Sequence, residues 1–266
     1  MPLLVRSIPG ATRSDAISPY SYPGAKVSGD PIDPAEVDLG QSGLVSVFVR
    51  DRLGDPSAFL GGTDRSLVLL SDPELPRKSR MSDRQQIRKN DAAGYRAMRL
   101  EGPTASAAHL ADFLAVYMET MHAVSAAEHY FFDADYFETL LASSLSWLVE
   151  VRGPDGDIAA AALAVRSDGF LHYYLSGTAD AHRLRAPSKN LIVVANDLAD
   201  DLGLPLNLGG GLSPGDGLEE FKRGFANREL AFRTHELICD PAAYEELSRG
   251  RSSAGFFPLY RAPAQP

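Results

Sequence analysis

Residues 217–225, GLEEFKRGF, combine charged and aromatic side chains in a way that could do chemistry. Lys222 and Arg223 lie between Phe221 and Phe225, shortly after the glycine run 209–211. Aromatic packing around the aliphatic stem of a lysine leaves its ammonium free to face a cleft. A purely structural amphipathic turn explains the same residues equally well. The segment therefore predicts either a cation presented to a substrate or a helical turn of the core.

The glycine run at 209–211 does not match the known nucleotide-binding loops. It lacks the Gly-Lys-Ser/Thr end of a Walker loop and the third spaced glycine of a dinucleotide fingerprint. A bulge or a close approach of the backbone after a strand is the simpler prediction. The six histidines of the chain form no HExxH or HxH pair, and there is no GxSxG sequence. We therefore expect no metal site, no serine hydrolase and no cofactor.

Two further groups of side chains could bind a substrate. Arg84 and Arg88 are four residues apart on an expected helix, so they share a face and form a modest basic patch or a merely solvated surface. In the expected strand HYYLS, alternation sends His172 and Tyr174 to one face and Tyr173 to the other. One tyrosine of this strand is therefore expected in the core and the other in a pocket.

Composition limits the classes of function. The chain has 266 residues, with 26 lysines and arginines against 35 aspartates and glutamates, and a formal charge of −9. This charge argues against sequence-independent binding along a nucleic acid, although not against a local basic groove. The single cysteine, Cys239, excludes an intramolecular disulfide and is expected in the core. We find no signal peptide and no apolar stretch near the roughly 18 residues of a membrane span, so we expect a cytoplasmic protein without a membrane partner.

The pattern of apolar residues predicts an α+β fold. Strands are expected at 44–50, 66–70, 95–100, 147–151, 158–165, 170–175, 206–208 and 231–239. Helices are expected from Ser82 to Gly94, from Thr104 through Met121, from Asp133 or Asp135 to 141, from 188 to Gly203, at 219–225 and at 241–249. Residues 1–43 are expected to be a loop-rich lead-in with short elements, because prolines recur there.

Several sequence blocks, taken in order, resemble the FemABX family. In the second half these blocks are LHYYLSGT at 171–178, APS at 186–188, NLGGG at 207–211 and FKRGF at 221–225. Upstream, RQQIRKN at 84–90, YMETM at 117–121 and YFF at 130–132 look like the family's middle segment. The resemblance covers most of residues 44–247, and the order and spacing of the blocks are more specific than any one of them. Members of this family are peptidyltransferases of the GNAT acetyltransferase fold that use aminoacyl-tRNA.

The resemblance implies two compact GNAT-like subdomains with mixed, largely antiparallel sheets flanked by helices. Residues 1–145 would form the first and 146–266 the second, without the coiled-coil arm of some members. An ordinary GNAT enzyme holds the pyrophosphate of acetyl-CoA on a glycine-rich loop before a helix. The matching residues 178–188 contain Pro187 and no glycine. They disfavour acetyl-CoA and leave room for another activated acyl donor.

The resemblance also implies roles for single residues. Lys222 matches the motif lysine that follows a phenylalanine, and its role would be to stabilise the oxyanion formed when an amine attacks an aminoacyl ester. Tyr174, Ser176 and Asn207 would line the acceptor pocket. The other expected substrate-binding residues are Phe221, Arg223, the pocket-closing Tyr20 and Tyr22, and Arg84 and Arg88, which would hold an anionic acceptor group or an RNA phosphate.

The implied function is transfer of an aminoacyl group from the 3′ end of aminoacyl-tRNA to the amine of a peptide or carrier-bound peptide. Peptide antibiotic assembly and cell-wall precursor assembly are the two settings considered. Two alternatives stay open: an acyl-CoA-dependent N-acyltransferase of the GNAT fold, and a catalytically silent GNAT-fold protein that binds a peptide or tRNA. The oligomeric state is left open.

Overall fold

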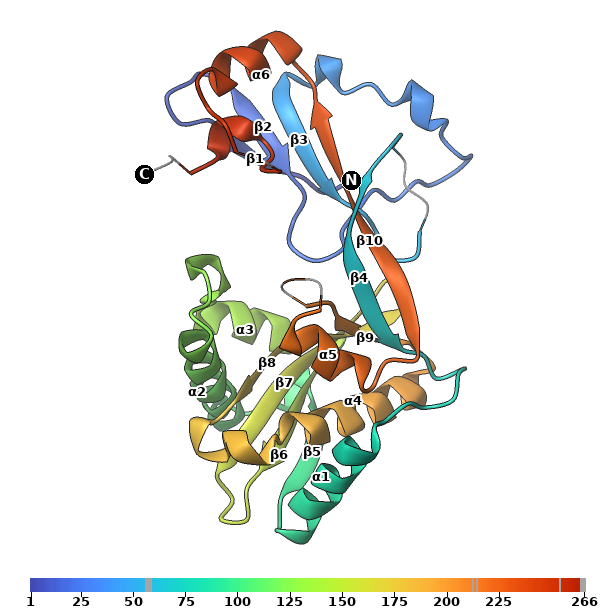
Figure 1. Cartoon of the computed structure of the whole chain (residues 1–266), viewed down its shortest axis with the longest axis vertical. Coiled ribbons are helices and arrows are strands. Elements are labelled where there is room, and N and C mark those ends of the chain that lie inside the picture. The colour runs from blue at the N-terminus through green and yellow to red at the C-terminus, as the bar shows by residue number, and fades with distance from the viewer. Residues whose placement is uncertain (56–58, 212, 214, 254, 264–266) are drawn as a thin grey trace. The chain divides into compact units, whose positions relative to one another are not determined.

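The computed structural model describes residues 1–55, 59–211, 213, 215–253 and 255–263, which form an α+β fold (Figure 1). Its strands are β1 Leu4–Ser7, β2 Ser14–Ile17, β3 Leu44–Arg50, β4 Thr63–Ser71, β5 Arg96–Glu101, β6 Ser146–Arg152, β7 Ile158–Ser167, β8 Phe170–Thr178, β9 Leu206–Gly209 and β10 Arg228–Ile238. Its α-helices are α1 Met81–Ala92, α2 Ala107–Ala123, α3 Ala134–Leu141, α4 Ser188–Leu202, α5 Gly217–Arg223 and α6 Pro241–Ser248. Among the described residues the strands form a mixed ten-stranded sheet in the order β1-β2-β3-β10-β4-β9-β8-β7-β6-β5. The predicted fold class is confirmed.

The chain divides into two compact units that are interleaved in sequence. One unit consists of residues 1–67 and 230–266, and the other of residues 68–229. The prediction instead divides the chain once, after residue 145. The structure differs because β5 pairs antiparallel with β6, from Arg96 opposite Arg152 to Glu101 opposite Trp147. Elements on both sides of residue 145 therefore belong to one sheet and one core.

The unit of residues 68–229 is a sheet with helices on both faces. Leu148 and Leu163 point from β6 and β7 into the core beneath α2 and α3, whereas Val149 and Ala162 point to the side where α4 packs. This alternation follows from the two-residue period of a strand. Alanine occupies four successive buried positions of β7, 159–162, and α2 and α4 both pack against this strand. The short side chains let a helix approach β7 from either face.

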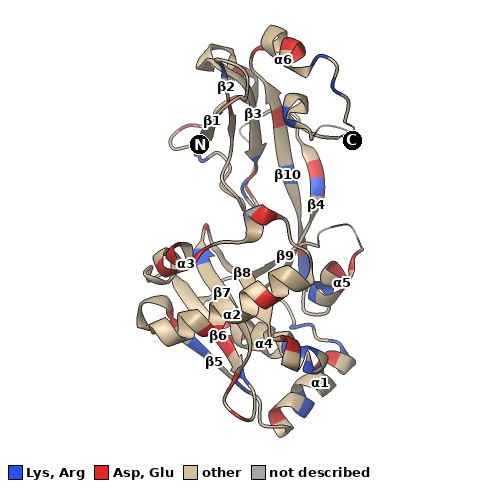
Figure 2. Ribbon diagram, turned by 90° about the vertical axis from the view of Figure 1, so that its left-hand side faces the viewer, with Lys and Arg blue, Asp and Glu red and all other residues tan. Residues whose placement is uncertain are grey.

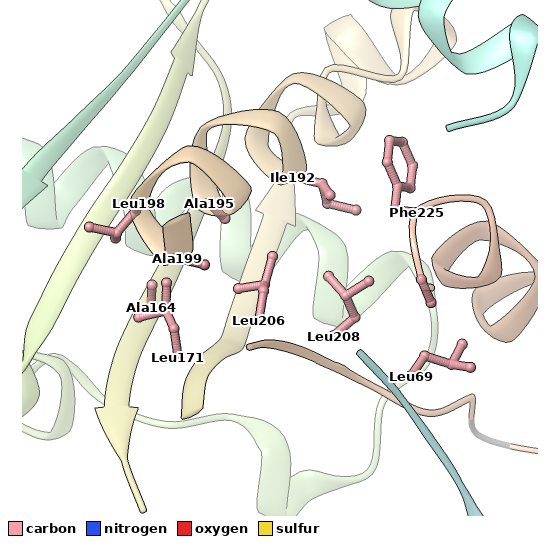
Figure 3. Close-up of a cluster of buried hydrophobic side chains, with 11 residues drawn as sticks. Leu69, Ala164, Leu171, Ile192, Ala195, Leu198, Ala199, Leu206, Leu208 and Phe225 are labelled. Atoms are coloured by element: carbon pink, nitrogen blue, oxygen red, sulfur yellow. The ribbon is translucent and has the colours of Figure 1, made fainter. Parts of the chain in front are cut away.

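A buried apolar cluster fixes the strands and the helix that carry the predicted site. From α4, Ile192, Ala195, Leu198 and Ala199 lie over Leu171 of β8 and Leu206 and Leu208 of β9 (Figure 3). Phe225, just after α5, joins the same cluster beside Ile192, and Phe221 packs against it. The ends of β8, β9 and α5 therefore share one rigid core.

Local sequence signals set most helix ends. Asp133 caps α3 and Asp240 caps α6, each accepting a main-chain hydrogen bond, and Gly203 ends α4 in the left-handed conformation. The expected starts of α1 and α2 are wrong. Ser82 was expected to cap α1, but Arg80 stands at the N-cap without a side-chain bond and the helix begins at Met81. α2 was expected to begin at Thr104, but it begins at Ala107 and is capped by Ser106.

The unit of residues 1–67 and 230–266 is smaller. β1 pairs antiparallel with β2, β2 runs parallel to β3, and β3 pairs antiparallel with β10. The loop-rich lead-in therefore contributes two strands to the sheet. The buried carboxylate of Asp15 is held by Arg6, Arg261 and the hydroxyl of Tyr260. Within the described residues, no helix has both the length and the apolar character needed to cross a membrane.

Candidate active site

A β-bulge in β8 sets the direction of its tyrosines. In the ladder with β7, Leu163 lies opposite Leu175 and Ala164 opposite Tyr173, so Tyr174 is the additional residue. The hydroxyl of Tyr174 lies 2.6 Å from the hydroxyl of Tyr136, on the α3 side of the sheet. Tyr173 instead packs into the two cores on the α4 side. The predicted split of the two tyrosines between the faces is confirmed.

The bulge also separates Tyr174 from Ser176, which were expected on one face. Ser176 lies opposite Ala162 and Tyr173 opposite Ala164, and both alanines pack in the cores on the α4 side. Burial raises the pKa of the Tyr173 phenol to about 12. The expectation of a shared face is wrong because one extra residue in a strand reverses the alternation beyond it. Ser176 therefore lies with Tyr173, and Tyr174 with Tyr136.

β8 and β9 separate shortly after they meet. Their parallel ladder consists of two pairs, Leu171 with Leu206 and His172 with Asn207. β8 continues to Thr178 with β7 on its other side. Within the described residues, the edge of β8 from Tyr173 onward therefore faces no strand. At the end of this edge the hydroxyl of Thr120 binds the main-chain N–H of Thr178 at 2.9 Å. The edge before Thr178 could pair with the main chain of an extended ligand such as a peptide.

Asn207 joins the two strands at the point where they separate. Its side chain is buried, its Nδ2 atom donates to Nδ1 of His172 at 2.9 Å, and its Oδ1 atom accepts from the main-chain N–H of Gly209 at 2.7 Å. Burial lowers the pKa of His172, which keeps the imidazole neutral and able to accept. Both ends of the Asn207 amide are thus occupied within the chain. Asn207, which was expected to line the acceptor pocket, therefore holds the strand junction and the glycine turn together.

The glycine run lets the backbone approach α5 closely. Gly209 has a φ of +74°, and a Cβ atom there would lie 3.3 Å from Nζ of Lys222. A Cβ atom on Gly211 would lie 2.5 Å from Oδ1 of Asp216, which caps α5. Only glycine fits these two positions without displacement. The close approach predicted for the run is confirmed.

Lys222 presents its ammonium to this turn. Nζ donates to the carbonyl oxygen of Gly210 at 2.7 Å, its one hydrogen-bond acceptor among the described residues, so two N–H groups remain for a ligand. Burial lowers the pKa of Lys222 to about 8, while the nearby carboxylate of Asp216 favours the charged form. The ring of the preceding residue, Phe221, meets that of Phe225 edge-on at 5.7 Å. The side chain is therefore a partly desolvated cation at neutral pH.

The remaining predicted site residues lie in other surroundings. Arg223 forms ion pairs with Glu219 and Glu229, so its charge is already balanced. Arg84 donates to the carbonyl oxygen of Ser79, and Arg88 projects from the same helix without an ion pair among the described residues. Tyr20 and Tyr22 belong to the other compact unit, where Tyr22 packs edge-on against Phe232 at 5.3 Å.

Sequence reasoning missed Tyr136, His172 and Asp216 as parts of this site. Asp216 carries a visible signal, because an aspartate directly before a short helical pattern predicts an N-cap. Tyr136 carries none, since its contact with Tyr174 spans 38 residues and depends on how α3 packs. Among the described residues, no three His, Cys, Asp or Glu side chains are grouped to hold a metal ion.

Comparison with known protein families identifies the family of this chain. The family described as "Acetyltransferase (GNAT) domain" matches residues 77–223, more than half of the chain. The chain belongs to this acetyltransferase (GNAT) domain family. It is an acyltransferase of the GNAT fold, and β6 to β9 with α4 and α5 lie in the matched segment. A search of curated proteins by sequence finds no match.

Solved structures support the fold. The crystal structure of FemX aligns with a TM-score of 0.63 at 11% identity, covering 92% of this chain and 85% of that one. L-PGS from Bacillus licheniformis aligns with a TM-score of 0.57 at 15% identity, covering 75% and 69%. The C-terminal domain of a putative lysylphosphatidylglycerol synthetase from Agrobacterium fabrum gives 0.54 at 12% identity, covering 77% and 72%. At these identities the likeness shows the fold alone.

Proposed function

We propose that this GNAT-fold protein is an aminoacyltransferase that moves an aminoacyl group from aminoacyl-tRNA to the amine of a peptide or peptide-like acceptor. The observation that carries the proposal is the contact of Lys222 Nζ with Gly210 O, beside the point where β8 and β9 separate. It gives a GNAT domain a fixed cation next to an open strand edge. A cation at this place suits a reaction in which negative charge develops on an acyl oxygen.

Aminolysis of an activated ester needs few further groups from the protein. In aminolysis the acceptor nitrogen attacks the ester carbonyl carbon, the C–N bond forms, and the C–O bond to the ribose breaks. The proton lost by the amine balances the proton gained by the ribose oxygen. The ester is already activated, so no covalent enzyme intermediate is needed. The protein must hold the two reactants together and stabilise the tetrahedral oxyanion, which is the role proposed for the Lys222 ammonium.

The segment before α4 supports a donor other than acetyl-CoA. Residues Asp180–Arg185 form a 3₁₀ helix, and Pro187 stands at the N-cap of α4. His182 is held between the hydroxyl of Tyr95 at 2.8 Å and a carboxylate oxygen of Asp157 at 2.7 Å. This packed, glycine-free turn replaces the glycine-rich loop on which a GNAT enzyme cradles a pyrophosphate.

The structural neighbours fit the same class of donor. One of them is FemX, and the sequence blocks of this chain resemble the FemABX family. Another is described as part of a putative lysylphosphatidylglycerol synthetase, which by its name attaches lysine to phosphatidylglycerol. We propose the single-stranded 3′ end of tRNA as the donor partner. A peptide amine of antibiotic or cell-wall precursor assembly is the proposed acceptor, with Tyr174 close to it.

The proposal is tested by incubating the protein with a pool of tRNAs charged with labelled amino acids and with candidate peptide amines. Label in an amide product identifies the amino acid and the acceptor together. The matched family description favours one alternative, an acyl-CoA-dependent N-acyltransferase. This alternative predicts a saturable calorimetric signal with acetyl-CoA and label transfer from labelled acetyl-CoA. Label transfer from tRNA without either of these decides for the proposal.

A further inference from the structure

A pocket of about 240 Å³ lies between α1 and α4, apart from Lys222. Its lining consists of Arg77, Lys78, Ser79, Arg84, Ile87, Arg88, Val193, Asn196 and Phe225. Ile87 and Phe225 both pack on the core cluster beneath α4. Together with Val193 they give the pocket an apolar wall that suits a planar ring.

Two polar groups of this pocket have no partner. Asn196 is 5% exposed, and its amide makes no hydrogen bond with any described residue. The hydroxyl oxygen of Ser79 is buried and equally unpaired within the described part of the chain. Buried polar groups are nearly always hydrogen-bonded, and of these two only the Ser79 hydroxyl is a buried atom without a partner. The amide of Asn196 instead opens onto the pocket, where a ligand can bind it.

The pocket carries positive charge, and part of this charge has no ion-pair partner among the described residues. Arg77 is paired with Asp197 and Asp200, and Arg84 donates to the carbonyl oxygen of Ser79. Lys78 and Arg88 form no ion pair with any described residue. Figure 2 shows Lys and Arg positions in blue along α1. In an acidic chain, two unpaired cations beside an apolar wall favour a ligand with both an anionic group and a ring.

A second hollow of about 510 Å³ adjoins the first and shares Arg77 and Lys78 with it. It is also lined by Asn227, Glu229 and Arg228, which is paired with Asp72. The pocket is also connected to α5. Arg80, at the start of α1, donates to the carbonyl oxygen of Glu220 at 2.8 Å, and Phe225 contacts Phe221 beside Lys222.

We propose that this pocket binds a nucleotide of the single-stranded 3′ end of the donor RNA. The base packs against Ile87 and Phe225 with its edge hydrogen-bonded to Asn196, and the phosphate is bound by Lys78 and Arg88. Single-stranded RNA is recognised in this way, through an unstacked base on a side-chain surface with polar groups at its edge. This inference rests on the proposed function, because it names the surface that binds the tRNA donor.

The test measures binding of an uncharged, fluorescently labelled RNA microhelix with a single-stranded 3′ tail, and of the same stem with a blunt end. The wild-type protein is expected to bind the tailed RNA about tenfold more tightly than the blunt one. Lys78→Ala and Arg88→Ala should each weaken binding of the tailed RNA about three- to tenfold and reduce the salt slope by about one. Asn196→Asp, which places a carboxylate in the pocket, should abolish the preference for the tail.

The control is Arg166→Ala, which removes one charge from an exposed arginine of β7 that has no ion pair among the described residues. If Lys78→Ala and Arg88→Ala bind the tailed RNA as tightly as the control Arg166→Ala, the site is overturned. This outcome holds even if Asn196→Asp fails to fold. A wild-type protein that binds no microhelix would overturn both the site and the tRNA donor. Tail binding that depends on the pocket, without aminoacyl transfer, would overturn the proposed function and leave the site standing.

Discussion

The Nζ atom of Lys222 donates a 2.7 Å hydrogen bond to the carbonyl oxygen of Gly210, which fixes a cation to the backbone that follows β9. Gly209 has no side chain to hinder this contact, and Asn207 binds the N–H of Gly209. The position of the ammonium therefore depends on three residues of one strand end as well as on α5. The predictions below follow from this arrangement and from the packing that supports it.

Lys222→Met should abolish most of the aminoacyl transfer while the fold survives. Removing one donor that stabilises an oxyanion reduces turnover by about 100- to 1,000-fold. Methionine keeps an apolar stem of similar volume, so thermal unfolding should change little. Turnover is measured under single-turnover conditions beside Lys26→Met, a matched loss of one exposed lysine in the other compact unit. Near-normal turnover of Lys222→Met would refute the role of the ammonium.

The rate should depend on pH through Lys222. Burial lowers its pKa to about 8, so the side chain is the cationic ammonium below this pH and the neutral amine above it. The neutral form cannot stabilise an oxyanion, and the rate constant should therefore fall by about tenfold per pH unit above the pKa. The acceptor amine contributes a rising limb, which the ratio of wild type to Lys222→Arg removes because arginine stays charged. A constant ratio across the pH range would contradict the assignment.

Asn207→Leu should lower the rate of transfer more than it lowers substrate affinity. The change leaves the N–H of Gly209 and Nδ1 of His172 without partners, so it should cost about 1–3 kcal/mol in the free energy of unfolding. The glycine turn then no longer holds Gly210 against Lys222. We expect kcat to fall at least about tenfold with little change in KM for the RNA donor, since one lost hydrogen bond of 1.4 kcal/mol in the transition state corresponds to tenfold.

Asn207→Asp is the matched comparison for this prediction, because its carboxylate still accepts from Gly209. It should retain more turnover than Asn207→Leu. If instead both variants raise KM for the peptide acceptor and leave kcat unchanged, Asn207 contacts the acceptor directly, as the sequence alone suggested.

Gly177→Ala should destabilise the unit of residues 68–229. A Cβ atom on Gly177 would lie 2.2 Å from the main-chain oxygen of Val116 and 2.5 Å from the nitrogen of Tyr117, both in α2. Backbone atoms cannot move aside as a flexible side chain can, so α2 must shift from β8 at a cost of about 1–3 kcal/mol or more. Chemical denaturation measures this loss. Gly217→Ala, where a Cβ atom meets nothing within 4 Å, should unfold like the wild type.

Much of the fold could be predicted because local patterns and tertiary packing agree. The expected strand at 44–50 coincides with β3, and the glycine expected to end α4, Gly203, has the left-handed backbone of a helix C-cap. The interleaved division into compact units could not be predicted. It depends on which strands pair, and the pairing of β5 with β6 brings together residues about 50 positions apart, which no local pattern records.

The sequence motif of the candidate site could be predicted, but the spatial arrangement of its residues could not. The glycine run and Lys222 were recognised from the residue types, but the hydrogen bond between Lys222 and Gly210 was not predicted. Ser176 was assigned to the wrong face because a single bulged residue at Tyr174 reverses the alternation, and a bulge leaves no distinct mark in a sequence. Arg223 looked like a free cation only because its partners Glu219 and Glu229 lie on either side of the motif.

The most direct test of the central claim is single-turnover transfer of a labelled amino acid from a defined aminoacyl-tRNA to a peptide amine, with and without prior ribonuclease treatment. The donor is the intact tRNA ester in one arm and labelled acetyl-CoA in the other. We expect an amide product that forms only from the tRNA ester, disappears after ribonuclease treatment and is reduced about 100-fold or more in Lys222→Met. An amide product that forms from acetyl-CoA and is unaffected by ribonuclease would contradict the account.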